Sequence, residues 1–308
     1  MWAAPKRLEV EAPALPLREA QRYCQRMAYR EAQNFYWGFI SLERDQRIAI
    51  YALYSFARQV DDEADSAGLS RLHARPQEGG TTSERLDERL AVHRERVRAC
   101  VRGEFADPVM QVLAHAVARH QIPESELLAL IDGVEMDLHR TRYQRWEDLR
   151  EYCRLVASVV GRMCVRIFGF DDPAALDRAD ELGLALQITN ILRDVREDAQ
   201  LGRIYIPAED LARFGVAERD LLQGRTSAGW HALVAFEILR AQELFERGLR
   251  VVDYIPWRAG VCVQTMAGIY HRILDKIGKD PELPLRARAS LSRIEKLRVV
   301  LESWLRAE

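Results

Sequence analysis

Apolar residues recur every three or four positions along most of the chain, which is the period of an α-helix buried on one face. We find no convincing pair of segments with the alternating pattern of β-strands. The sequence therefore predicts an all-helical protein. The predicted helices span residues 17–32, 45–64, 83–103, 108–121, 123–137, 147–168, 173–197, 209–214, 218–222, 230–252, 260–277 and 289–307.

Two of these helices have middle segments without charge, 156–161 and 182–192, and we expect them to be the most deeply buried. A break rich in Gly, Pro and Thr at 68–82 predicts a mobile surface loop. The break separates two helices of the same composition zone, so we predict one domain over 17–308. Residues 1–16 form a disordered or loosely packed arm in this prediction.

The charge balance limits the possible partners. The chain of 308 residues carries 45 basic and 47 acidic side chains, so no global field favours nucleic acid or an anionic membrane. Five cysteines without a CxxC pair indicate reduced thiols. No secretory signal or membrane span is apparent, so we expect a cytoplasmic protein, with peripheral attachment to the inner face of the membrane as an alternative. The oligomeric state is left open.

Two acidic clusters carry the local charge pattern. Asp61 and Asp65 are four residues apart, with Asp62 between them, so they share one helical face. Asn190, Asp194 and Asp198 also advance by four and drift by only about 40° around a helix at each step. Each cluster thus forms a short stripe of oxygen-bearing side chains.

Such stripes favour a bound cation. Like charges four residues apart destabilise a helix, and both clusters are predicted near helix C-terminal ends, where the macrodipole disfavours anions. Carboxylate and amide oxygens select a hard ion, and Mg²⁺ is usually held by carboxylates together with substrate phosphates. Arg58, Arg193 and Arg203 could bind phosphate oxygens. The alternative is that each cluster is a solvated charged face, which is less favourable for two clusters that both follow apolar helices.

Three segments resemble the squalene/phytoene synthase family of head-to-head prenyl transferases. They are residues 54–65 with the first acidic cluster, residues 152–161, Tyr-Cys-Arg-Leu-Val-Ala-Ser-Val-Val-Gly, and residues 187–198 with the second cluster, which continues through 202–207. The resemblance extends from about residue 17 to residue 297. It implies a single-domain isoprenoid synthase bundle around an apolar channel, with the two acidic motifs on facing walls near its mouth.

The resemblance also implies roles for individual residues. The implied ligands of several Mg²⁺ ions are Asp61, Asp62, Asp65, Asn190, Asp194 and Asp198. The implied catalytic residues are Tyr54, Arg58, Arg193, Tyr205 and Tyr270. The implied substrate-binding residues are Phe35, Phe39, Tyr152, Ala157, Val160, Gly161, Gln187, Asn190, Arg203 and Arg288. Several also have a plainer interpretation, since Ala157, Val160 and Gly161 would suit close helix packing. Met136 and Asp137 match a family segment to which we assign no role.

The implied reaction joins two prenyl diphosphates head to head, through a cyclopropylcarbinyl diphosphate, with release of diphosphate. Residues 32–35 and 195–198 look closer to bacterial presqualene diphosphate synthases, so we favour farnesyl diphosphate as substrate and presqualene diphosphate or squalene as product. NADPH would be needed only if the reaction proceeds to squalene. The alternative is a phytoene synthase that uses two geranylgeranyl diphosphates. More remote alternatives are a class I terpene cyclase and a non-catalytic assembly protein. Beyond the substrates we expect no nucleic-acid partner, and peripheral membrane contact for product release stays open.

Overall fold

The computed structural model describes residues 15–32, 35–73, 82–105 and 107–305, with the backbone alone described for 63–73 and 82–87. The prediction of an all-helical fold is confirmed for these residues, whose sole β feature is an isolated parallel bridge between Arg142 and Ile204. The helices are α1 (Leu17–Glu31), α2 (Tyr36–Phe39), α3 (Arg44–His73), α4 (Thr82–Val101), α5 (Pro108–His120), α6 (Glu124–His139), α7 (Trp146–Cys153), α8 (Val159–Phe168), α9 (Ala174–Arg193), α10 (Val195–Gln200), α11 (Ala208–Arg213), α12 (Glu218–Leu222), α13 (Trp230–Gly248), α14 (Trp257–Lys279), α15 (Leu283–Arg286) and α16 (Arg293–Leu305).

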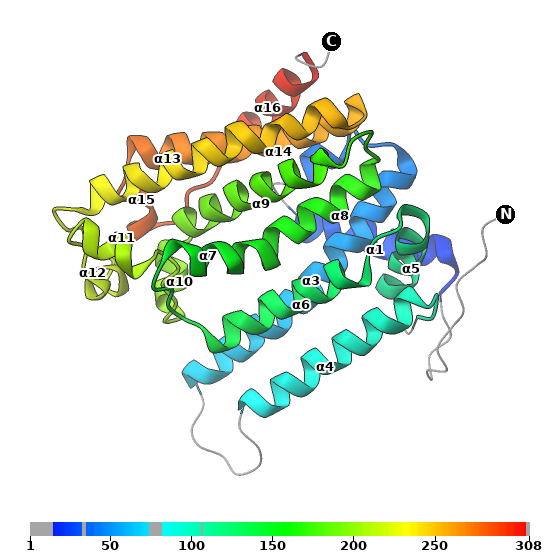
Figure 1. Ribbon diagram of the computed structural model, residues 1–308, viewed down its shortest axis with the longest axis horizontal. Helices are drawn as coiled ribbons and strands as arrows, with labels where there is room; N and C mark the ends of the chain where they lie inside the picture. The colour runs from blue at the N-terminus through cyan, green and yellow to red at the C-terminus, as the bar shows by residue number, and fades with distance from the viewer. Residues whose placement is uncertain (1–14, 33–34, 74–81, 106, 306–308) are drawn as a thin grey trace.

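The helices pack as a bundle with α9 near its centre (Figure 1). Helix α9 contacts α8, α13 and α14, while α3 contacts α1, α4, α5 and α6. The approach of α9 to the α7–α8 segment is close because both sides carry small residues. A Cβ atom on Gly183 would lie 2.6 Å from the Cα of Ser158, and one on Gly161 would lie 2.9 Å from the carbonyl oxygen of Ala179. The two helices with uncharged middle segments are thus neighbours in the core.

The backbone between α7 and α8 forms one π-helical turn, η1 (Arg154–Ser158), which the sequence pattern did not predict. A turn of this kind inserts an extra residue into a helix and is often found at functional sites. After α13 the chain forms a 3₁₀ segment, η2 (Leu249–Tyr254). Helix α14 then returns along the bundle, and α16 packs on its outer side.

Several predicted boundaries were wrong. Helix α3 continues to His73, so residues 68–73 are helical rather than part of the predicted loop. Gly68 costs only about 1 kcal/mol in a helix, whereas Pro76 disfavours helix in the residue before it. The rest of the predicted loop up to Thr82, and nearly all of the predicted arm at 1–16, lie outside the described residues.

The second acidic cluster does not lie on one unbroken helix. Helix α9 ends at Arg193 and α10 begins at Val195, with Asp194 between them at φ −105° and ψ 12°. The four-residue hydrogen bonds nevertheless persist across the break, from Asp194 N to Asn190 O and from Asp198 N to Asp194 O, both 2.9 Å. In addition, the last helix begins at Arg293 rather than at 289, and the short helices α2 and α15 were not predicted. No helix of the described residues has the length and apolar character needed to span a bilayer.

Candidate active site

An apolar channel runs through the bundle between α3, the η1–α8 segment, α9 and α14. It encloses about 1210 Å³ of space not filled by protein atoms, part of which is open to solvent. The residues that line it are Phe35, Phe39, Ile50, Leu53, Tyr54, Ala57, Val156, Ala157, Val160, Gly161, Cys164, Val165, Phe168, Ala179, Leu182, Gly183, Leu186, Gln187, Asn190, Val251, Val263, Met266 and Ala267.

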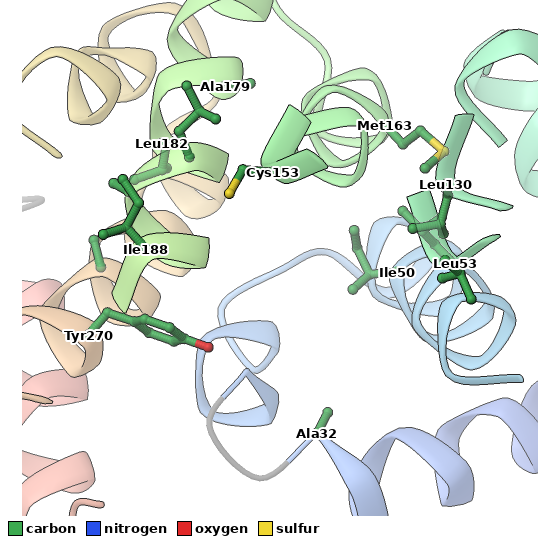
Figure 2. Packing of buried hydrophobic residues seen from close by; sticks show 14 of the residues in the cluster. Ala32, Ile50, Leu53, Leu130, Cys153, Met163, Ala179, Leu182, Ile188 and Tyr270 are labelled. Atoms are coloured by element: carbon green, nitrogen blue, oxygen red, sulfur yellow. The ribbon is translucent and has the colours of Figure 1, made fainter. Parts of the chain in front are cut away.

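The walls of the channel come from opposite sides of the bundle. Figure 2 shows Ala179 and Leu182 on α9 across from Ile50 and Leu53 on α3, and the hydroxyl of Tyr270 points into the space between them. On α9 the lining runs from Asn190 to Ala179, a rise of about 16 Å along the helix axis. One end therefore carries amide groups, and the rest of the wall is apolar.

The first acidic motif lies one helical turn beyond the channel-lining part of α3. Tyr54 and Ala57 line the channel, and Asp61 follows Ala57 by four residues on the same face. Arg58 pairs with Asp61 at 3.0 Å and with Asp62 at 2.7 Å. Asp62 points elsewhere and lines a separate cleft beside α1. The side chain of Asp65 lies outside the described residues, and because α3 continues to His73, the predicted helix end near this motif was wrong.

The second acidic motif is more deeply buried than the first, and arginines also form ion pairs with its Asp194 carboxylate. Arg193 donates from Nε to Asp194 Oδ1 at 2.7 Å, and Arg288 Nε lies 3.0 Å from the same oxygen. Burial, together with the charges of Asp194 and Asp137, raises the pKa of Asp198 to about 8. Asn190 donates to Gln187 at 3.2 Å, but its Oδ1 atom is buried and accepts no hydrogen bond from the described residues.

Tyr270 on α14 lies near Arg193 of the second motif and near Tyr54, which precedes the first motif on α3. Its ring stacks on Phe35 with the centroids 5.8 Å apart. Burial raises the pKa of Tyr270, and the nearby Arg193 guanidinium lowers it. The pKa of Tyr54 on the opposite wall is raised to about 12, mainly by burial, and Tyr270 contributes to that increase. Tyr54 thus lies near Asp61 of the first motif, and Tyr270 near Asp194 of the second.

Tyr152 and Tyr205 are among the predicted residues that do not line the channel, as are Tyr270, Arg203 and Arg288. Tyr152 and Tyr205 are both buried, and both donate hydrogen bonds to Asp137, from Tyr152 at 2.7 Å and from Tyr205 at 2.8 Å. Arg203 is also buried, and burial raises the pKa of Tyr205 and of Asp198 while the charge of Arg203 partly opposes that rise. These residues form a second polar group behind the second acidic motif.

The donor set at the mouth fits a hard divalent cation. Aspartates from both motifs and the unsatisfied Asn190 Oδ1 supply oxygen atoms only, and no thiol lies among them. A cation beside Asp198 would also offset the cost of ionising a buried carboxylate. Among the described side chains no three His, Cys, Asp or Glu gather closely enough to hold an ion by themselves. Substrate phosphates commonly complete a Mg²⁺ site of this kind.

The sequence reasoning missed much of the apolar wall. Gly183 precedes Gln187 by four residues, and Leu186 and Leu182 precede Asn190 by four and eight, so counting back along the helix from the acidic motif would have found them. Phe168 and Val251 line the channel from the end of α8 and from η2. Neither residue belongs to a sequence motif, and each reaches the channel only through the packing of the helices in the folded chain.

Comparison with known proteins gives a consistent result. The family model for squalene/phytoene synthase matches residues 29–295. The chain is 34% identical over 292 residues to a phytoene synthase of Mycobacterium bovis, covering 92% of this chain and 90% of that protein. It is 33% identical over 320 residues to a 15-cis-phytoene synthase of Synechocystis, covering all of this chain and 91% of the relative. A squalene synthase structure from Alicyclobacillus acidocaldarius superposes with a TM-score of 0.75 at 30% identity, covering 86% and 96% of the two chains.

Proposed function

The chain belongs to the squalene/phytoene synthase family of prenyl transferases, and we propose that it condenses two geranylgeranyl diphosphates head to head to form phytoene. The proposal replaces the farnesyl substrate that we favoured from the sequence. It is supported by the names of the curated relatives, which are phytoene synthases at 33–34% identity over more than nine-tenths of the chain. The family itself is shown, whereas the choice of chain length is our proposal.

The polarity of the channel supports a prenyl diphosphate as the substrate class. Its walls are apolar from Ala179 to Leu186, and its mouth carries the carboxylates of Asp61 and Asp194 with their arginine partners. A prenyl diphosphate has the same division, with a long hydrocarbon chain and a multiply charged head. The chain would lie in the channel and the head between the two acidic motifs.

We propose that Asp61, Asp65, Asp194 and Asp198, with the Asn190 amide oxygen, hold Mg²⁺ together with the diphosphate. Bound Mg²⁺ would stabilise the negative charge of the departing diphosphate. Arg58 and Arg193 now pair with these aspartates, and they would turn to phosphate oxygens once the carboxylates bind the metal. The arginines thus offset part of the negative charge of the acidic motifs before substrate binds.

The remaining residues act on the carbocation. When the C1–O bond of one substrate breaks, diphosphate leaves with the electron pair, and the double bond of the second substrate attacks C1. The cation that results would lose a proton as the cyclopropane ring closes, giving the cyclopropylcarbinyl diphosphate. Departure of the second diphosphate, rearrangement and loss of another proton would then give phytoene. The rings of Phe35, Tyr54 and Tyr270 would face the carbocation formed at C1, each stabilising it by about 0.5–2 kcal/mol. The apolar wall would exclude water, which would otherwise quench the cation.

The test is product analysis. The purified protein is incubated with Mg²⁺ and either the C20 or the C15 prenyl diphosphate, with and without NADPH, and the extracted lipid is identified. We expect phytoene from the C20 substrate. Presqualene diphosphate or squalene from the C15 substrate alone would favour the reading suggested by the Alicyclobacillus acidocaldarius neighbour. The absence of product from both would refute the proposal.

A further inference from the structure

Three buried tyrosines pack together behind the second acidic motif. Tyr143, Tyr152 and Tyr205 are 1%, 4% and 8% exposed. Their ring centroids lie 5.3 Å apart for Tyr152 and Tyr205, and 5.5 and 5.8 Å from Tyr143 to each of the other two. We call these three residues the tyrosine cluster. None of them lines the channel, so the cluster is a neighbouring structure rather than a part of the substrate wall.

Asp137 is the hydrogen-bond acceptor of the cluster. It lies in the last turn of α6, and its two carboxylate oxygens each accept from one phenol, Oδ2 from Tyr152 and Oδ1 from Tyr205. The phenols come from α7 and from the segment 201–207, so one side chain ties together three parts of the chain. Hydrogen bonds to a charged group are stronger than neutral ones, and the distances of 2.7 and 2.8 Å are those of well-formed O–H···O bonds.

The segment 201–207 directly continues the second acidic motif. It is held to α10 by the hydrogen bond from Arg203 N to Asp198 O, 2.8 Å. It is held to the loop after α6 by a bond from Ile204 N to Thr141 O at 3.0 Å, and Ala208 N bonds Tyr143 O at 2.8 Å. Tyr205 lies between these anchors. A movement of Tyr205 would therefore be transmitted to α10, which carries Asp198.

We propose that Asp137 is a positioning residue of the diphosphate site, which holds Tyr205 against Tyr152 and so fixes α10 and Asp198 at the mouth of the channel. The inference rests on the proposed function, because it needs Asp198 to act in the site. Asp137 is also close enough to Asp198 to add to the negative field there. Its carboxylate lies outside both acidic motifs, and its position follows from the folded packing of α6, α7 and the segment 201–207.

The first test compares Asp137→Asn with Asp132→Asn. Both replacements preserve shape and remove one charge from α6, but Asp132 is half-exposed and pairs with Arg94 at 2.7 Å on the surface. The readout is the rise in unfolding temperature when Mg²⁺ and inorganic pyrophosphate are added, which needs no turnover. We expect the Mg²⁺ concentration at half effect to rise roughly tenfold in Asp137→Asn, the range seen when a residue that orients a metal ligand is changed. Asp132→Asn should match the parent protein.

The second test asks whether Asp137 acts through Tyr205. Tyr205→Phe keeps the ring in the cluster and removes the hydroxyl. If the two groups act as one unit, Tyr205→Phe should raise the Mg²⁺ concentration at half effect in the same direction. The double variant should then be no worse than Asp137→Asn alone. Additive effects would contradict the proposed route.

A third variant, Asp194→Asn, separates the failure of this inference from failure of the proposed function. If Asp194→Asn abolishes the Mg²⁺-dependent stabilisation while Asp137→Asn behaves as Asp132→Asn does, the positioning role is refuted and the metal site stands. If Asp194→Asn has no effect, the metal assignment fails and the inference fails with it. A lower unfolding temperature in Asp137→Asn without a change in Mg²⁺ dependence would show a purely structural role and would also refute the proposal.

Discussion

The two acidic motifs have the same four-residue spacing but very different surroundings. On α3 the side chains of Asp61, Asp62 and Arg58 are 51%, 55% and 34% exposed, and the helix continues past them. At the second motif Asp194 is 17% exposed and Arg193 only 8%, and the helix breaks between them and α10. One motif is thus a partly solvated helix face, and the other is a buried turn.

The same four-residue spacing of aspartates therefore has different energetic consequences in the two motifs, because the carboxylates differ in burial. Ion pairs at the first motif are exposed to water and salt, so each contributes only about 0–1 kcal/mol. At the second motif the charges of Asp194 and Asp198 are partly removed from water, and the pKa of Asp198 rises to about 8. A cation or an arginine partner therefore matters more to the second motif. The predictions below test this asymmetry.

The largest expected effect is on turnover. Asp194→Ala should lower Mg²⁺-dependent product formation by about 10³-fold or more, because it removes a charge that would hold the diphosphate and its metal. Asp61→Ala should also abolish turnover if the diphosphate spans both motifs. The assay is lipid extraction after reaction with the C20 substrate, with circular dichroism as the control for folding. Full activity in either variant would refute the metal assignment for that motif.

The next effect concerns stability without substrate. Arg193→Ala leaves the buried Asp194 with only the more exposed Arg288 as partner, so it should destabilise the fold by about 3 kcal/mol. Arg58→Ala should cost less than about 1 kcal/mol, because Asp61 and Asp62 can be solvated. Urea unfolding of the two variants measures the difference. Equal losses would show that burial does not distinguish the motifs.

Glu237 on α13 is a buried carboxylate outside the channel lining, and it shows how burial changes a pKa. Glu237 shares Arg240 with Asp210, and burial raises the pKa of Glu237 to about 7. The folded protein then holds a proton that the unfolded chain releases above its ordinary pKa of about 4.5. The free energy of unfolding should therefore fall by about 1–3 kcal/mol as the pH rises from 4.5 to 7.

Glu237→Gln should remove this part of the pH dependence and leave turnover nearly unchanged. Denaturant unfolding at several pH values, with the activity assay in parallel, measures both. A loss of turnover comparable to that of Asp194→Ala would mean that burial alone, rather than position at the channel mouth, governs the activity. In that case the position of the two acidic motifs at the channel mouth would not explain their effect on turnover.

The sequence predicted the parts of the molecule that depend on local pattern. The helical period located the main helices, and the motif spacing placed Asp61 and Asp65 on one helical face, whereas a position near the channel mouth was only implied by the family resemblance. It could not predict the break at Asp194, because the residues around it are ordinary helix formers and the break appears only in the folded chain. The hydrogen bonds from Tyr152 and Tyr205 to Asp137 could not be predicted either, because the three residues lie up to 68 positions apart in the sequence and meet only in the folded chain.

The smallest expected effect distinguishes Asp61 from its neighbour Asp62, although the family resemblance implies that both are metal ligands. Successive residues of a helix point about 100° apart. Asp61 follows Tyr54 and Ala57 on the channel face of α3, whereas Asp62 lines the cleft beside α1 with Arg26 and Arg30. Asp62→Asn should therefore lower turnover by less than about tenfold, since Arg58 keeps its bond to Asp61.

Steady-state kinetics of Asp62→Asn and Asp61→Asn at several Mg²⁺ concentrations test this distinction. The matched pair removes one charge from adjacent positions of the same exposed helix, so general destabilisation should be similar in both. If Asp62→Asn needed as much additional Mg²⁺ as Asp61→Asn, both carboxylates would contribute to the metal site, as the family resemblance implies. The first motif would then act through its whole exposed face, in contrast to the second motif, where Asp194 lies in a turn between two helices.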